Sequence, residues 1–149
     1  YTLMSLGAFA VVMALKEGNQ DNERYGHFAG IGFSRPFLGM AMSIFMLSLA
    51  GFPPLGGFTG KFYLFRSAVA SGHTELAIIG VLNSLLSVVY YLRVVMMMYM
   101  EEGGMQGKSF SSSPYLYVAI ALAALGVLYL GIAPGLLLEI SRESFLSLK

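Results

Sequence analysis

Long apolar runs, separated by polar connections, make up most of this chain. A helix needs roughly 20 apolar residues to cross a bilayer, and the runs that follow residue 35 reach that length. The last of these runs contains no charged residue at all. We therefore predict membrane-spanning helices over residues 36–70, 76–100 and 115–138.

The first apolar run, residues 1–15, is shorter than a full span. We expect it to be the second half of a helix, so that residues 1–149 form the C-terminal part of a single, longer membrane domain. Residues 139–149 follow the last span and are expected to form an amphipathic tail.

One of the predicted spans contains the stretch LAGFPPLGGFTGKFYLF, residues 49–65. Pro53 and Pro54 each remove a backbone donor and clash with the preceding turn, so a continuous helix cannot pass through them. Irregular backbone at membrane depth is tolerated only where protein buries it or water lines it. We therefore predict a discontinuous helix, with one half ending near Gly51 and the other beginning near Gly57.

Lys61 follows this interruption closely. The positive end of a helix dipole disfavours an ammonium group, and burial disfavours it again, so both effects favour a neutral amine that can accept and release a proton. On this interpretation Lys61 is a proton-relay site. Alternatively, residues 36–60 already suffice for a span, and Lys61 would extend into lipid headgroups beside Arg66. Spacing alone leaves both interpretations open.

The span over residues 76–100 carries its own polar side chains. Asn83, Ser87 and Tyr90 fall within an arc of about 60° on one helix face. Such a stripe faces other helices or a hydrated path, and we favour interhelical hydrogen bonding over a proton wire. Arg93, near the end of this span, is either a buried relay residue or counter-charge, or a cation that extends to the membrane surface, and the membrane-surface role is favoured.

Composition supports a membrane protein and narrows its chemistry. The chain is 56% hydrophobic and 11% charged, with a mean hydropathy of +0.70, whereas a soluble domain carries about a quarter charged residues. No strand-like alternation appears, so the predicted fold is an all-α transmembrane bundle. The net charge of +1, without a basic run, argues against a nucleic-acid partner. The lack of cysteine excludes thiolate-bound clusters or zinc within this chain.

The stretch MLSLAGFPPLGGFTGKFYLF, residues 46–65, resembles the antiporter-like membrane subunits of proton-pumping NADH–quinone oxidoreductase, respiratory complex I. Three further stretches resemble the subunit N (subunit 2) branch of that family and extend the likeness over essentially the whole chain. They are SLGAFAVV (5–12), RPFLGMAMSIFMLSLAG (35–51) and YYLRVVMMMYM (90–100). The continuation GKFYLF also favours this branch over the cation/proton antiporter subunits.

The resemblance implies a fold of inverted five-helix repeats, each with one broken helix and an ionisable residue at the break. Lys61 matches the family's lysine in the second broken helix, which favours the relay interpretation. The implied function is proton translocation through Lys61, driven by quinone reduction elsewhere in the complex, with no redox chemistry in this chain.

The same resemblance implies where the chain acts and with what. Flavin and iron–sulfur clusters are expected in partner subunits, and no cofactor is expected here. The expected partners are the other membrane subunits of complex I, the lipid bilayer and protons, in the bacterial cytoplasmic membrane. The alternatives are a cation/proton antiporter subunit of the same fold, or a purely structural membrane subunit in which Lys61 only anchors the helix.

Overall fold

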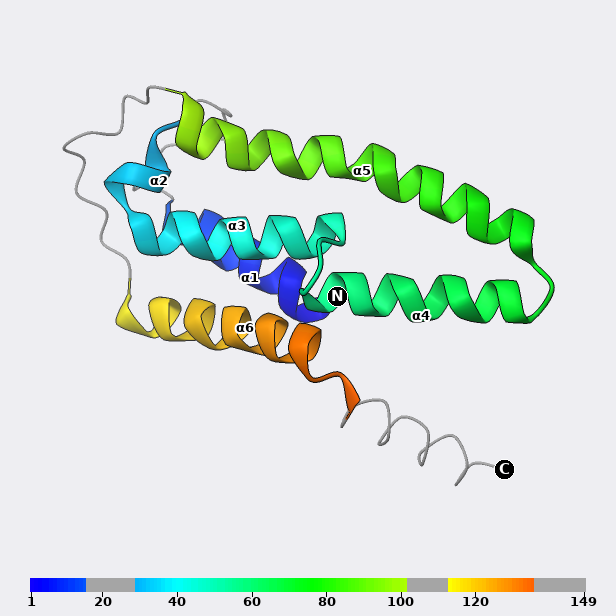
Figure 1. The fold of residues 1–149 in the computed structure, drawn as a ribbon. Helices are drawn as coiled ribbons and strands as arrows, with labels where there is room; N and C mark the ends of the chain where they lie inside the picture. The colour runs from blue at the N-terminus through cyan, green and yellow to red at the C-terminus, as the bar shows by residue number, and fades with distance from the viewer. Residues whose placement is uncertain (16–28, 102–112, 136–149) are drawn as a thin grey trace.

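The computed structural model describes residues 1–15, 29–101 and 113–135, and every regular element within these ranges is a helix (Figure 1). This confirms the predicted all-α class. The helices are α1 (Thr2–Ala14), α2 (Ile31–Ser34), α3 (Pro36–Ala50), α4 (Gly56–Ala70), α5 (Thr74–Met100) and α6 (Pro114–Ile132).

The longest helix, α5, lies along both α3 and α4 (Figure 1). Its 27 residues extend over about 40 Å, whereas the 15 residues of α3 and of α4 each extend over about 22 Å. In Figure 1, α4 continues beyond the end of α3 in the same general direction. The interruption between α3 and α4 therefore faces the middle of α5.

Prolines set several helix boundaries. Pro36 and Pro114 occupy the first turn of α3 and α6, where a missing N–H costs nothing. At its other end, α6 stops at Ile132 rather than at the predicted residue 138. Pro134 explains the difference, because it lacks a donor and forces Ala133 out of the helical region, to φ −129° and ψ 67°. The predicted tail over residues 139–149 lies outside the described residues.

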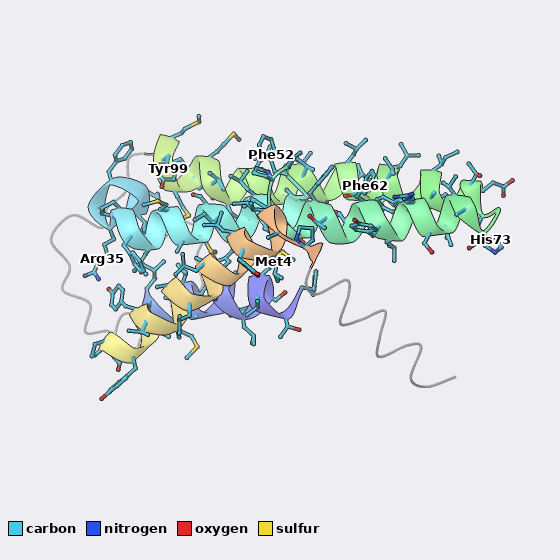
Figure 2. The ribbon with its side chains drawn as sticks, turned by 60° about the horizontal axis from the view of Figure 1, so that its bottom comes forward. Met4, Arg35, Phe52, Phe62, His73 and Tyr99 are labelled. Atoms are coloured by element: carbon cyan, nitrogen blue, oxygen red, sulfur yellow. The ribbon has the colours of Figure 1, made fainter. Side chains whose placement is uncertain are left out.

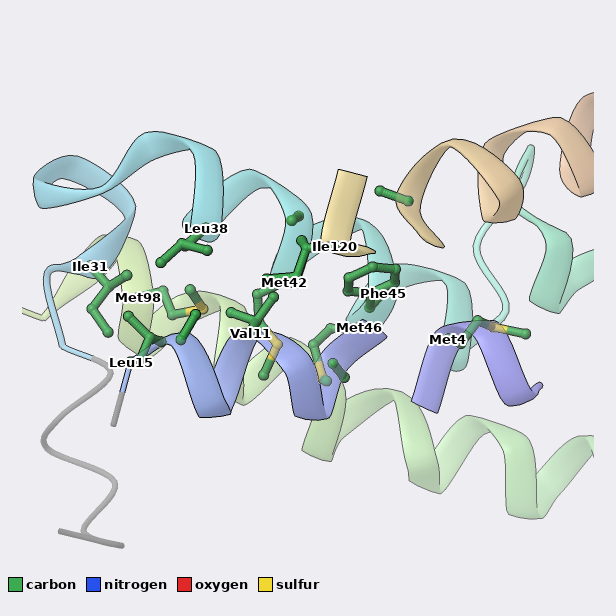
Figure 3. Close-up of a cluster of buried hydrophobic side chains, with 14 of the residues drawn as sticks. Met4, Val11, Leu15, Ile31, Leu38, Met42, Phe45, Met46, Met98 and Ile120 are labelled. Atoms are coloured by element: carbon green, nitrogen blue, oxygen red, sulfur yellow. The ribbon is translucent and has the colours of Figure 1, made fainter. Parts of the chain in front are cut away.

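The buried core lies where α1, α3, α5 and α6 meet (Figure 3). The ring of Phe45 on α3 is fully buried and lies against Gly7 of α1, where a β-carbon would collide with it. The same buried cluster includes, among others, Val11, Leu38, Met42, Met98, Ile120 and Val127. This core holds α3 firmly, and the C-terminal end of α3 carries the candidate site.

Apolar side chains also cover much of the outer surface. Two of the described helices, α5 and α6, are long and apolar enough to cross a membrane, while α1 and α3 are apolar but shorter. On α5 the side chains of Leu82, Leu86 and Val89 are more than half exposed. Figure 2 shows His73 at the tip of the α4–α5 hairpin and Arg35 with Tyr99 at the opposite end of the molecule. Polar groups thus mark the two ends of an apolar bundle.

Candidate functional site

The C-terminal end of α3 closes on a glycine. After Ala50 the chain turns at Gly51, which has the left-handed conformation (φ 89°, ψ 38°) that glycine adopts most easily. The Gly51 N–H donates to the Ser48 carbonyl at 3.0 Å, and the Phe52 N–H donates to the Leu47 carbonyl at 2.9 Å. This pair of bonds is the Schellman motif. The end of α3 and the start of α4 each lie one residue from the boundaries predicted from the sequence.

Lys61 completes this helix end. A helix leaves its last four carbonyls without partners inside the helix, and the Schellman motif satisfies those of Leu47 and Ser48. The other two, of Leu49 and Ala50, accept hydrogen bonds from Lys61 Nζ at 2.9 and 3.1 Å. The ammonium group therefore lies at the negative end of the α3 dipole, where a positive charge is stabilised.

The side chain of Lys61 reaches this position from the second turn of α4. Bonds from Cα to Cβ in a helix point towards its N-terminus, so Lys61 extends back to the interruption. Its third hydrogen bond goes to Ser84 Oγ on α5, at 2.8 Å. The half-buried ammonium has three N–H groups, and three acceptors surround it.

Ser48 fixes the start of α4 from outside that helix. The N-cap residue, Leu55, has no side-chain oxygen to accept a bond from the first turn. Instead the Gly57 N–H donates to Ser48 Oγ at 3.0 Å, and the Ser48 hydroxyl donates to Met4 Sδ at 2.9 Å. Ser48 is fully buried. It therefore links α1, α3 and α4 at the interruption.

Two glycines allow the backbones to come this close. A β-carbon on Gly57 would overlap the Ser48 carbonyl, and one on Gly131 of α6 would overlap the Pro54 carbonyl. Neither overlap can be relieved by turning a flexible side chain, because the atoms in the way belong to the backbone. The interruption is consequently packed tightly against both α3 and α6.

Open space borders Lys61 on one side of α4, and a second space lies further along the same helix. A cavity of about 400 Å³ is lined by α1, α3 and α4, and its lining includes Tyr1, Ser48, Gly60, Lys61 and Leu64. A groove of about 480 Å³ lies between α4 and α5 and includes Leu64 and Asn83. The cavity that Lys61 lines has room for several water molecules, which occupy about 30 Å³ apiece in the liquid. Lys61 therefore lies beside a space with room for water.

We predicted that a polar stripe on α5 (Asn83, Ser87 and Tyr90) would form hydrogen bonds to other helices. Within the described residues, no such bond is found. Ser87 donates to the carbonyl of Asn83 on its own helix at 2.9 Å, and Tyr90 is 72% exposed. The interhelical bond is made by Ser84 instead. The depth at which Lys61 pairs with Ser84 could have been predicted from the sequence, because the two residues are nearly equidistant from the turn at Gly72. Residues equidistant from the turn of a helical hairpin lie at the same depth.

Arg93, the second predicted site residue, lies away from Lys61. It follows Ser84 by nine residues, which places it about 13 Å further along α5 and on the opposite face. Arg93 is exposed, and no hydrogen bond or ion pair joins it to another residue that the structure describes. Within the described ranges, no group of three or more His, Cys, Asp or Glu side chains is arranged to hold a metal ion.

Comparison with known proteins gives consistent matches. Residues 1–87 match the model of a family described as NADH:quinone oxidoreductase/Mrp antiporter, TM. The chain is 44% identical over 144 residues to NADH-quinone oxidoreductase subunit N of Trichlorobacter lovleyi, which covers 97% of this chain and 30% of that protein. It is 41% identical over 150 residues to NADH-quinone oxidoreductase subunit N 1 of Solibacter usitatus, covering 100% and 31%. The chain thus spans about 30% of the length of these relatives.

Among solved structures, the chain is similar to one of respiratory complex I from Thermus thermophilus with bound aureothin. The two share 31% sequence identity and superpose with a TM-score of 0.80. The match covers 93% of this chain and 31% of that chain. Similarity in sequence and similarity in fold to these proteins therefore both extend over nearly the whole length of this chain.

Proposed function

Because the chain belongs to the NADH:quinone oxidoreductase/Mrp antiporter transmembrane family, we propose that it is part of the proton-translocating subunit N of an NADH–quinone oxidoreductase. The family and the complex I neighbour make it an integral membrane protein. In this role the chain performs no redox chemistry. Quinone reduction elsewhere in the complex drives proton transfer through it, and the flavin and iron–sulfur clusters belong to partner subunits.

On this proposal, α3 and α4 are the two halves of one discontinuous transmembrane helix. At about 22 Å, each is too short for the hydrocarbon core of a bilayer, which is about 30 Å thick. Both pack against α5, which is long enough to cross by itself. The interruption then falls within the membrane, where nonhelical backbone must be enclosed by protein or water. Gly57 and Gly131 let this stretch pack closely against α3 and α6, whereas Phe52, Pro53 and Pro54 are exposed in this chain.

The observation that carries the proposal is the position of Lys61 Nζ, inside the interruption and beside a cavity. An ionisable side chain within a membrane protein marks an ion or proton path by default. Of the two cations on α4, Arg66 keeps its proton under all ordinary conditions, whereas an amine can release one. Lys61 is accordingly assigned the relay role.

The direction in which Lys61 extends argues against the anchor interpretation. A lysine that anchors a helix in headgroups stretches along the helix towards water. Lys61 instead turns back and donates to the last carbonyls of α3 and to Ser84. A surface anchor needs none of these bonds. A role of Arg93 in proton transfer stays a prediction, and its exposed position favours the membrane-surface role for it.

The rival function is a subunit of a cation/proton antiporter, because the family description includes Mrp antiporters. The experiment is deletion of the gene for the complete protein, followed by its restoration, with proton uptake measured in inverted membrane vesicles. We expect NADH-driven, quinone-dependent uptake to be lost and then regained, with or without sodium. Sodium-dependent proton transport that is lost and regained without any change in NADH-driven uptake would contradict the proposal and support the rival.

A further inference from the structure

The three acceptors around Lys61 differ in chemistry. Two are backbone carbonyls, of Leu49 and Ala50, which hold a proton donor in place but carry no hydrogen of their own to pass on. The third, Ser84 Oγ, is a hydroxyl that can accept one hydrogen while it donates another. Among the described partners of Lys61, therefore, only Ser84 can continue a chain of proton transfers.

We propose that Ser84 is the residue through which Lys61 exchanges its proton with water in the groove between α4 and α5. This inference rests on the proposed relay role of Lys61 and adds to it the next carrier and the route. The role makes Ser84 a proton-transfer residue of the site rather than only a contact that positions the lysine.

The transfer balances with water as the co-reactant. An N–H bond of the Lys61 ammonium breaks as its proton forms a new bond to Ser84 Oγ. In the same event the original hydroxyl hydrogen of Ser84 passes to a water molecule. Lys61 is left as a neutral amine, Ser84 remains a neutral hydroxyl, and the positive charge leaves on the water as hydronium. Run in reverse, the same step returns a proton to Lys61.

The geometry supports this route. The distance from Lys61 Nζ to Ser84 Oγ, 2.8 Å, is the shortest of the three hydrogen bonds. Ser84 is half-buried, and the residue beside it on α5, Asn83, lines the groove between α4 and α5. Leu64 lines both that groove and the cavity beside Lys61. Lys61 lines the cavity and Asn83, next to Ser84, lines the groove, so the Lys61–Ser84 bond lies between these two spaces.

Ser87 supplies a matched control one turn further along α5. It is also a half-buried serine, but its hydroxyl donates to the carbonyl of Asn83 within the same helix. Replacing Ser87 by Ala therefore removes a hydroxyl of the same type from the same helix without touching Lys61. Any general effect of losing a serine from α5 appears in this variant as well.

The test compares Ser84→Ala, Ser84→Thr, Ser84→Asn and Ser87→Ala, each in the complete protein within the assembled complex. Protons taken up per NADH oxidised are measured in inverted vesicles, with the amount of assembled complex determined for each variant. Threonine keeps the hydroxyl, whereas asparagine offers Lys61 an acceptor oxygen without a hydroxyl to hand on the proton. Lys61→Ala is measured alongside.

We expect Ser84→Ala and Ser84→Asn to lower the number of protons taken up per NADH oxidised, because each removes the hydroxyl that passes the proton on. Ser84→Thr and Ser87→Ala should remain close to the unaltered protein. If Ser84→Asn equals Ser84→Thr, Ser84 only positions Lys61 and the inference is overturned. This comparison holds even if Ser84→Ala fails to assemble.

The failures of the two proposals are distinguishable. If Lys61→Ala abolishes proton uptake while Ser84→Ala leaves it unchanged, the Ser84 inference alone is overturned. If Lys61→Ala also leaves uptake unchanged, the relay role of Lys61 fails, and the inference about Ser84 fails with it.

Discussion

Ser48 and Gly57 are joined by a hydrogen bond across the nonhelical residues between α3 and α4, with the Gly57 N–H donating to Ser48 Oγ at 3.0 Å. The bond ties the end of one helix to the start of the next. Lys61 makes a second tie, from α4 back to the last carbonyls of α3. The interruption is therefore a defined structure with its own hydrogen bonds, and its parts can be tested separately.

Replacing Ser48 by Ala should destabilise the assembled protein by about 1–2 kcal/mol, because it removes the oxygen that caps α4 and leaves the Gly57 N–H buried without a partner. The measurement is the thermal midpoint of the solubilised complex. Ser43→Ala is the matched control, since the Ser43 hydroxyl donates to the Gly39 carbonyl of its own helix at 2.8 Å. Equal midpoints for the two variants would show that the cap across the interruption contributes nothing.

Replacing Gly57 by Ala should be more damaging, at about 1–3 kcal/mol or failure to assemble, because the new β-carbon meets the Ser48 carbonyl. Gly60→Ala makes the same chemical change one turn along α4, where no described atom lies within 4 Å of the new group. Alanine also favours helix formation, so Gly60→Ala should be neutral or slightly stabilising. The amount of assembled complex in membranes distinguishes the two, and a well-assembled Gly57→Ala variant would contradict the packing.

Replacing Gly51 by Ala combines two effects. The left-handed conformation at φ 89° costs an L-residue about 1–2 kcal/mol. The β-carbon would also lie 3.3 Å from Lys61 Nζ, so the ammonium group must shift by a few tenths of an ångström. Gly72, at φ 82° with open space around it, suffers only the first effect. We expect both variants to lose stability, but only Gly51→Ala to lower the protons taken up per NADH. Equal proton uptake in both would contradict the contact with Lys61.

Much of the fold followed from local signals in the sequence. The pair of prolines located the nonhelical stretch between α3 and α4 to within one residue at each end. The end of α6 at Ile132 was also predictable from the sequence, because Pro134 cannot continue a helix and disfavours the helical conformation at Ala133. These features depend on residues close together in the chain, so sequence reasoning can reach them.

The bonds of Lys61 could not be predicted in this way. Sequence reasoning placed the lysine near the positive start of α4, but the folded chain brings it to the negative end of α3, where its charge is stabilised. Which serine of α5 meets it depends on how α4 and α5 are rotated about their axes. Helical periodicity singled out Asn83, Ser87 and Tyr90, and tertiary packing selected Ser84. The tie from Ser48 to Gly57 likewise arises only on folding.

The relay role of Lys61 is tested most directly by the ratio of protons taken up to NADH oxidised in inverted vesicles that carry Lys61→Ala. Arg66→Ala is the control, because it removes the other cation of the same helix from an exposed position. We predict that the ratio falls in Lys61→Ala and stays unchanged in Arg66→Ala. An unchanged ratio in a fully assembled Lys61→Ala complex would contradict the relay and leave Lys61 as the C-terminal cap of α3 alone.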